Sequence, residues 1–283
     1  MFKYFVHKQL CVSKLDLNLS QSDFDAFVFG SDQIWNADIT DGGDKIYYGC
    51  FNASENKALI AYSASSGSIN CIRGNNKQLL EFALSRFQSI SVREKELSNY
   101  IKGLFDVTVD VTCDPVILSG VSVFNRIAKK ARRKRPYLLL FQVSRRGDVE
   151  QFAHKIASRL NLELINLVSG YMFVNGIFRK NISPELFLGY LKEAAYIVTT
   201  SFHGTAFSIL FHKSFTTVSQ NETIDERSLS LLRDVGLINR MSAVNLQPDL
   251  SEINYDMVDD KIVKLRNVSN DYLLSALCKV NIK

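Results

Sequence analysis

The stretch at residues 196–215, YIVTTSFHGTAFSILFHKSF, constrains the fold more than any other part of the chain. It opens with a short β-branched and aromatic run, which predicts a buried strand. Gly204 then permits a tight turn, and Ala206, Phe207 and Leu210 recur at helical spacing behind it. A buried strand that passes through a short turn into a helix is typical of parallel α/β sheets, so we expect that class of fold.

The same alternation of strand and helix recurs along the rest of the chain. Strand patterns occur at 25–30, 57–63, 89–92, 107–111, 137–143, 162–167 and 215–218. Helix patterns occur at 76–86, 94–101, 147–160, 184–195, 226–235 and 255–281. This alternation implies parallel sheets covered by helices, and the economical architecture is an α/β fold of two Rossmann-like domains.

A basic segment separates the two expected domains. Most residues between 126 and 135 are Lys or Arg, and Pro136 follows them. A charge run ahead of a proline is typical of a linker or an exposed helix end. We therefore expect one domain over 1–125 and a second over 126–283, which ends in a helical region. The basic segment offers a surface for anionic lipid, and a solvated face is the alternative.

Composition narrows the class of protein. A net charge of +5 on 283 residues suits anionic small molecules or a membrane surface better than nucleic acid. The five cysteines are scattered and form no C-x-x-C, so we expect reduced thiols in a cytoplasmic protein. The sequence has no apolar run of about 18 residues that would predict a membrane span. It also lacks Walker A, G-x-G-x-x-G and G-x-S-x-G motifs, so it gives no support to a nucleotide hydrolase, a dinucleotide enzyme or an α/β-hydrolase.

Charged side chains follow several of the expected strands. The carboxyl ends of parallel strands lie at one edge of a sheet, where open α/β proteins bind ligands. Arginine binds carboxylates and phosphates in a bidentate manner, and a helix N-terminus favours an anion. No pair of histidines has metal-ligand spacing, so we expect an anion site without a metal. The residues at these strand ends are Asp32, Arg93, Arg145, Arg146 and His203.

Each of these side chains also has an ordinary structural explanation. Asp32 and His203 are both suited to capping a turn or a helix. Arg93 has glutamates close by in the sequence, and arginines 145 and 146 are suited to a solvated surface. Trp35 and Tyr62 either stack on a sugar ring or fill a core. The residues alone leave these alternatives open.

Five segments taken together resemble the polysaccharide pyruvyl transferase family. In chain order they are FVFGSDQIWN, LIAYSASSGS, SISVREKE, VTCDPVIL and YIVTTSFHGTAFSILFHKSF, within residues 24–240. The resemblance implies a GT-B-like fold of two Rossmann-like domains. It also implies transfer of the enolpyruvyl unit of phosphoenolpyruvate onto sugar hydroxyls of a cell-surface glycan, which gives a pyruvate ketal. Phosphoenolpyruvate is the donor substrate, and no cofactor is implied.

The resemblance implies roles for particular residues. Asp32 and Trp35 match the family's G-S-D-x-x-W motif. Arg93 matches S-V-R-[DE], where the arginine is expected to hold donor anions, and His203 matches [RS]-[LF]-H-G, which is implicated in donor binding and acid–base chemistry. The implied set is His203 and Asp32 as catalytic residues, Arg93, Ser201, Gly204, Arg145 and Arg146 at the donor, and Trp35 and Gln33 at the acceptor.

Two departures from the family pattern qualify these roles. Some members carry arginine where this chain has Ser201, so Arg145 or Arg146 is expected to supply the missing contact. Members usually begin with a strand and an N-x-G loop well upstream of G-S-D, so we expect a shortened N-terminal domain. In this scheme residues 1–125 form the acceptor side, and residues 126–283 form the donor side.

Three functional hypotheses follow. The first is a pyruvyl transferase that acts on a polysaccharide precursor, with the basic segment holding the enzyme at the cytoplasmic face of the membrane. The second is a GT-B-type glycosyltransferase that uses a nucleotide sugar, since a fold does not fix a function. The third is an inactive family member that binds a glycan. The acceptor sugar and the oligomeric state do not follow from the sequence.

Overall fold

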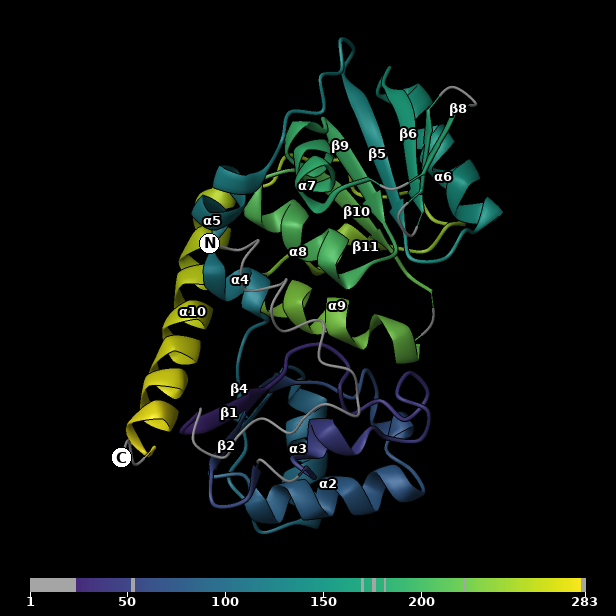
Figure 1. Ribbon diagram of the computed structural model, residues 1–283. Coiled ribbons are helices and arrows are strands. Elements are labelled where there is room, and N and C mark those ends of the chain that lie inside the picture. The colour runs from purple at the N-terminus through teal and green to yellow at the C-terminus, as the bar shows by residue number, and fades with distance from the viewer. Residues whose placement is uncertain are drawn as a thin grey trace. The chain divides into compact units, whose positions relative to one another are not determined.

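The computed structural model describes residues 24–51, 54–168, 171–174, 177–180, 182–220 and 222–280. The chain divides into two compact units. Unit 1 consists of residues 1–114 and 268–283, and unit 2 consists of residues 115–267. Each unit contains a parallel sheet with helices packed on it, which confirms the expected α/β fold class with two Rossmann-like domains (Figure 1).

Unit 1 is built on a sheet of four parallel strands in the order β1-β2-β3-β4. Helices α2 and α3 and the short 3₁₀ helices η1 and η3 complete the elements described between residues 24 and 114. The strands are β1 (Ala26–Phe29), β2 (Ala58–Ala64), β3 (Ser89–Val92) and β4 (Asp110–Val111). The helical elements are η1 (Lys45–Tyr48), η3 (Ile69–Cys71), α2 (Asn75–Arg86) and α3 (Lys95–Leu104).

Alternation along β2 assigns its side chains to the two faces of this sheet. Leu59 and Ala61 belong to an apolar core that includes Leu80 of α2 and Ile101 of α3. Successive strand residues point to opposite faces, so Tyr62 points away from that core. On this second face Tyr62 contacts Tyr272 of α10 (Tyr255–Cys278), with 6.4 Å between the ring centroids.

Unit 2 contains a sheet of seven strands in the order β11-β10-β9-β5-β6-β7-β8. The first five strands in this order are parallel, and β7 and β8 form an antiparallel hairpin on β6. The alternation of strand and helix in the sequence predicts parallel strands alone, so the antiparallel hairpin is a correction to that prediction. The strands are β5 (Tyr137–Gln142), β6 (Glu163–Val168), β7 (Tyr171–Val174), β8 (Ile177–Lys180), β9 (Tyr196–Thr199), β10 (Ser214–Val218) and β11 (Met241–Ser242).

Helices cover both faces of this second sheet (Figure 1). Phe152 of α6 shares an apolar core with Leu138 of β5 and Val198 of β9. On the other face Phe141 of β5 contacts Phe187 of α7, with 4.9 Å between the ring centroids. The helical elements are α4 (Pro115–Ser119), α5 (Val121–Ile127), α6 (Gly147–Arg159), α7 (Pro184–Glu193), α8 (Phe202–Leu210), α9 (Glu222–Val235), η4 (Ile238–Arg240) and α10 (Tyr255–Cys278).

The chain passes from unit 1 to unit 2 after Asp114, whereas the sequence analysis placed a domain boundary after residue 125. The short helices ahead of the basic segment pack on unit 2, as shown by the 4.9 Å ring contact of Phe124 with Phe207 in α8. The last part of α10, from Val268, belongs to unit 1. The acceptor and donor sides and the GT-B-like arrangement stay predictions. No helix among the described residues is long and apolar enough to cross a membrane.

The strand order of unit 2 contains a topological switch point. From β5 the chain passes through α6 to β6 on one side, and β9 pairs with β5 on the other side. Two loops that diverge from neighbouring strands leave a crevice at their carboxyl ends, which is where ligands bind in such sheets. The loops that follow β5 and β9 therefore define one edge of unit 2 as a candidate binding edge.

Candidate functional site

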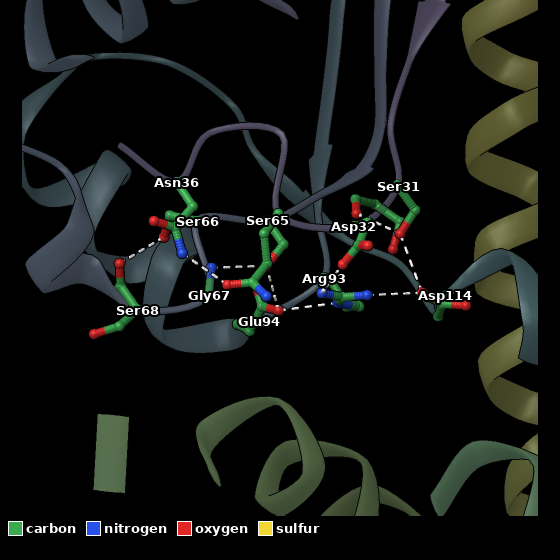
Figure 2. Close-up of polar contacts among 12 residues, drawn as sticks. Ser31, Asp32, Asn36, Ser65, Ser66, Gly67, Ser68, Arg93, Glu94 and Asp114 are labelled. Carbon is green, nitrogen blue, oxygen red and sulfur yellow. Dashed lines mark hydrogen bonds and ion pairs between the residues drawn. The ribbon is translucent and has the colours of Figure 1, made fainter. Parts of the chain in front are cut away.

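The carboxyl ends of the unit 1 strands bring a dense polar network to one edge of the sheet (Figure 2). Asp32 follows β1, Ser65 follows β2, Arg93 follows β3 and Asp114 follows β4. The strands are parallel, so the alternation of strand and helix in the sequence is sufficient to place these four residues on one edge. We call this network the unit 1 edge.

Arg93 lies at the centre of the unit 1 edge. Its side chain is 5% exposed, Nε donates to Glu94 Oε1 at 3.0 Å, and Nη1 donates to Asp114 Oδ2 at 2.8 Å. Nη2 lies 3.7 Å from Asp32 Oδ1. Burial lowers the pKa of the Arg93 guanidinium, but the charges and hydrogen bonds of Glu94 and Asp114 outweigh burial, and the net shift of the pKa is upward. Arg93 is therefore a charged group compensated by protein carboxylates.

The serine-rich loop after β2 is attached to this ion-pair network. Ser65 Oγ donates to Glu94 Oε1 at 2.8 Å and accepts from the Gly67 amide at 2.9 Å. Gly67 has φ +74°, and a Cβ there would lie 2.0 Å from Gln33 Oε1. Only glycine fits both the backbone conformation and the close approach. Gln33, predicted at the acceptor, thus lies against this loop, where its Oε1 accepts from Asn36 Nδ2 at 2.7 Å.

Asp32 is the acidic side chain of the unit 1 edge that reaches solvent. Its side chain is 65% exposed, and its backbone has φ 51°, a left-handed conformation that is uncommon outside glycine. The backbone of Asp32 is fixed because its carbonyl accepts from the Ser65 amide at 3.1 Å. The preceding Ser31 donates through Oγ to the Ser63 carbonyl at 3.0 Å and to Asp114 Oδ2 at 3.2 Å. A carboxylate held in this way is suited to accepting hydrogen bonds from an exposed ligand.

Trp35 lies in the core of unit 1. Its side chain is 1% exposed, it stacks on Tyr48 with 6.3 Å between the ring centroids, and Nε1 donates to the Tyr47 carbonyl at 3.2 Å. Tyr62 is also buried, and its hydroxyl donates to the Cys113 carbonyl at 2.7 Å. Both rings therefore fill the core of unit 1, which is the structural alternative given above. The placement of Trp35 gives no support to its stacking on an acceptor sugar.

His203 lies in the first turn of α8, directly after β9. Its side chain is partly buried, and Ser201, the N-cap residue, is buried and makes no side-chain capping bond. Gly204 lies inside the helix, so the tight turn expected there is wrong. Glycine is required because a Cβ at this position would lie 2.1 Å from Thr199 Oγ1. The helix thus begins close against β9, and the first amide groups of a helix form a site of positive potential.

Arg145 and Arg146 lie in the loop between β5 and α6. Arg145 donates to both carboxylate oxygens of Glu150, at 2.8 and 3.2 Å, and its side chain is 62% exposed. Arg146 donates through Nε to Asp148 Oδ1 at 3.1 Å, and its Nη2 also bonds this carboxylate. The hydrogen bond from Arg145 is the largest influence on Glu150 and lowers its pKa, and Arg146 acts on the pKa of Asp148 in the same way.

The loops after β5 and β9 are bonded to each other. The Val143 amide donates to Thr200 Oγ1 at 3.4 Å, and the Thr200 amide donates to the Phe141 carbonyl at 3.1 Å. These bonds place the two arginines and the start of α8 at the same switch point of the sheet. We call this group of residues, Arg145, Arg146, Ser201, His203 and Gly204, the unit 2 edge.

The predicted site residues thus form two groups. Asp32, Gln33 and Arg93 come together on the unit 1 edge, and the other predicted polar residues come together on the unit 2 edge. The prediction omitted Glu94, Ser65 and Asp114, although all three lie in the resembling segments SVREKE, SASSGS and CDPVIL. Among the residues that the structure describes, no group of three His, Cys, Asp or Glu side chains is placed to hold a metal ion.

Comparison with known proteins identifies the family. A protein-family model described as polysaccharide pyruvyl transferase matches residues 2–222, which is most of the chain. No curated protein and no solved structure matches the chain. Both groups of predicted residues lie within the matched range. The chain therefore belongs to the polysaccharide pyruvyl transferase family and is a transferase.

Proposed function

We propose that this protein transfers the enolpyruvyl group of phosphoenolpyruvate to sugar hydroxyls of a cell-surface polysaccharide precursor and forms a pyruvate ketal. Family membership supports the reaction class. The observation that carries the assignment of a donor site is the unit 2 edge, where two arginines, a helix start and His203 share one switch point. Phosphoenolpyruvate carries a carboxylate and a phosphate, and these are the groups that arginines and helix N-termini bind.

The donor binds at the unit 2 edge in this proposal. Arg145 and Arg146 now pair with Glu150 and Asp148, and all four side chains lie at the start of α6. Exposed ion pairs contribute little stability, so an incoming dianion is able to exchange for these carboxylates. The first amide groups of α8, which follow the N-cap residue Ser201, offer the donor a site of positive potential, and Gly204 lets this helix begin close against β9.

The acceptor sugar binds at the unit 1 edge. Asp32 offers an exposed carboxylate, and Gln33 lies beside the serine-rich loop. Arg93 is buried between two carboxylates, so we assign it the role of a positioning residue that holds Asp32 and the Ser65 loop. Direct contact of Arg93 with the donor is the alternative, and the binding experiment below separates the two.

His203 supplies the acid–base chemistry, because imidazole titrates near neutral pH. Protonation of C3 of phosphoenolpyruvate and addition of a sugar hydroxyl to C2 give a tetrahedral phosphoketal. The C2–O bond to phosphate then breaks, and inorganic phosphate leaves. A neighbouring hydroxyl of the same sugar adds to C2 and loses its proton, which closes the ketal. His203 gives the proton to C3 and regains one from the first attacking hydroxyl, and the proton of the second hydroxyl goes to the departing phosphate, so the enzyme returns to its starting state.

Ligand-dependent thermal stability tests the donor assignment. A ligand at 100 times its Kd stabilises a protein by about 2.7 kcal/mol, which gives a clear shift of Tm. We expect phosphoenolpyruvate to raise the Tm and UDP- and GDP-sugars to leave it unchanged. Replacing Arg145 and Arg146 together by alanine removes the shift, whereas the matched change Arg132→Ala in the exposed basic segment keeps it.

Three other outcomes change the proposal. Stabilisation by a nucleotide sugar alone replaces it with the glycosyltransferase hypothesis. A chain that no donor stabilises supports the inactive glycan-binding hypothesis. A folded Arg93→Lys variant that loses the phosphoenolpyruvate shift makes Arg93 a donor ligand, because lysine keeps the charge but loses the bidentate geometry.

We further propose that the basic segment holds the enzyme against anionic lipid at the cytoplasmic face. Six of its side chains are exposed, whereas Arg133 pairs with Glu163 at 2.7 Å. Each such cation near an anionic surface contributes about 1 kcal/mol to membrane binding. Sedimentation with phosphatidylserine vesicles, but not with phosphatidylcholine vesicles, is the expected result, and equal sedimentation with both contradicts it. The exposed residues are Arg126, Lys129, Lys130, Arg132, Lys134 and Arg135.

A further inference from the structure

A separate pocket in unit 1 lies at the amino ends of its strands. Ser89 and Asp110, which line the pocket, are the first residues of β3 and β4. The unit 1 edge lies at the other ends of the same strands. The pocket has a volume of about 390 Å³, within the range of about 300–1,000 Å³ that is typical of small-molecule sites.

Charged and polar side chains are among the residues that line this pocket. Asp110, Asp271, Ser275 and Lys279 contribute to its rim, and each of these residues is exposed. The rim carries two carboxylates, of Asp110 and Asp271, and one ammonium group, of Lys279. Its net charge is therefore negative, so it favours ligands that donate hydrogen bonds and disfavours anions. The last turns of α10 supply one wall, because Asp271 and Ser275 recur at helical spacing, and Lys279 directly follows the end of the helix.

The wall formed by α10 is fixed to the sheet. The Tyr272 hydroxyl donates to the Ala61 carbonyl of β2 at 2.7 Å. The Cys113 amide donates to Ser269 Oγ at 2.9 Å, and both groups are buried. Because these bonds hold the helix in one register, the polar rim is preorganised, and a ligand loses little affinity to ordering the protein.

Ser89 contributes a buried hydroxyl to the same pocket. The residue is 8% exposed, and its Oγ has no hydrogen-bond partner among the residues that the structure describes. Buried polar groups are nearly always hydrogen-bonded, so a hydroxyl beside a pocket that has no partner among the described residues is available to a ligand that enters the pocket.

We propose that this pocket binds a neutral sugar unit, as a carbohydrate site separate from the candidate site. A sugar presents several hydroxyls, which donate to Asp110 and Asp271 and accept from Lys279. The carboxylates disfavour a phosphorylated or carboxylated ligand. The preference for a sugar over other polyols rests on the proposed function, in which a polysaccharide precursor is the acceptor. The pocket then holds a second unit of that glycan.

Saturation-transfer NMR on the full chain tests the proposal with galactose, glucose and N-acetylglucosamine, each alone, and with glycerol for comparison. We expect at least one sugar to bind and glycerol not to bind. A hydrogen bond to a charged group contributes about 1.5–3 kcal/mol, so Asp271→Asn is expected to weaken binding by about tenfold or more. Ser275→Trp, a change at an exposed position, is expected to block the pocket.

Matched variants separate this pocket from the candidate site. Asp260→Asn makes the same chemical change on the same helix outside the pocket and is expected to leave sugar binding intact. Asp271→Asn is expected to retain the phosphoenolpyruvate-dependent rise in Tm, and His203→Ala is expected to retain sugar binding. The proposal is overturned if none of the three sugars binds, or if Asp271→Asn and Ser275→Trp bind sugar like the unchanged protein. It is also overturned if Asp32→Asn abolishes sugar binding and Asp271→Asn does not.

Discussion

The unit 1 edge and the unit 2 edge carry charged groups of the same kinds in opposite environments. Arg93 is 5% exposed and bonds two buried carboxylates, whereas Arg145 is 62% exposed and bonds one carboxylate, in the helix that follows its loop. A fully buried ion pair is part of the scaffold, because removing one partner leaves the other as an uncompensated buried charge. An exposed ion pair exchanges its partner at little cost. We therefore propose a scaffolding role for Arg93 and anion binding for Arg145 and Arg146.

The largest expected effect comes from removing Arg93. Arg93→Ala leaves the carboxylates of Glu94 and Asp114 buried without their cation, so we expect the free energy of unfolding to fall by about 3–5 kcal/mol. Urea denaturation, monitored by circular dichroism, measures this loss of unfolding free energy. Replacing Arg145 by alanine serves as the exposed control and is expected to leave the denaturation midpoint almost unchanged. If the two changes lowered the free energy of unfolding equally, Arg93 would not differ from Arg145 in its contribution to stability.

The second effect concerns activity. His203→Ala is expected to lower kcat for ketal formation by about 100-fold or more, which is the usual contribution of a general acid–base group. Stability is expected to change little, because His203 is partly exposed in the first turn of α8. Phosphate release and denaturation are measured on the same preparation. A loss of folding together with activity would assign His203 to the scaffold and would make the two edges alike.

The expected fold and the positions of the charged residues follow from the same property of the sequence. Alternating strands and helices require parallel sheets, and parallel strands place Asp32 and Arg93 at one edge and Arg145 and His203 at another. The charged residues could therefore be grouped from the strand pattern alone, before any contact was known.

Burial and side-chain partners could not be predicted in this way. Trp35 lies within a motif of the family, but its ring points into the core, and the one-dimensional pattern of a loop does not encode that direction. Asp114 precedes a proline in the segment VTCDPVIL, and nothing in that pattern indicates that its side chain bonds Arg93. The hairpin of β7 and β8 was missed even though an Asn-Gly pair, a frequent hairpin-turn sequence, separates the two strands in the sequence.

The third effect tests how closely each edge is packed. A Cβ at Gly204 would lie 2.1 Å from Thr199 Oγ1, and Thr199 is buried. Overpacking of this kind usually lowers stability by about 1–3 kcal/mol, so Gly204→Ala is expected to lower the Tm. On the unit 1 edge, Gly67→Ala meets the partly exposed Gln33, but its φ of +74° adds backbone strain. The Gly204 variant is also expected to lose phosphoenolpyruvate binding, whereas the Gly67 variant is expected to keep it.

The smallest effect concerns the exchange of partners at the unit 2 edge. Glu150→Gln removes the carboxylate that now binds Arg145, so phosphoenolpyruvate no longer competes with it. The Arg145 side chain is 62% exposed, although that of Glu150 is 18% exposed. A pair that solvent reaches from one side contributes about 1 kcal/mol, which corresponds to an increase in affinity of about fivefold. Isothermal titration measures this gain, with Glu81→Gln on the exposed face of α2 as the matched control. An unchanged or weaker affinity would mean that Arg145 does not contact the donor.

The pH dependence of the same pair gives an independent measurement. Arg145 lowers the pKa of Glu150 in the folded protein, so the contribution of the pair to stability is present above the ordinary glutamate pKa and is lost as the pH falls through the lowered value. Between pH 5 and 8 Glu150 is therefore ionised, and the gain in phosphoenolpyruvate affinity from Glu150→Gln is expected to be constant across this range. Below the lowered pKa of Glu150, its protonation releases Arg145 in the unchanged protein as well, and the two affinities are expected to converge. A gain that persisted under acid conditions would come from a contact other than the Arg145 pair.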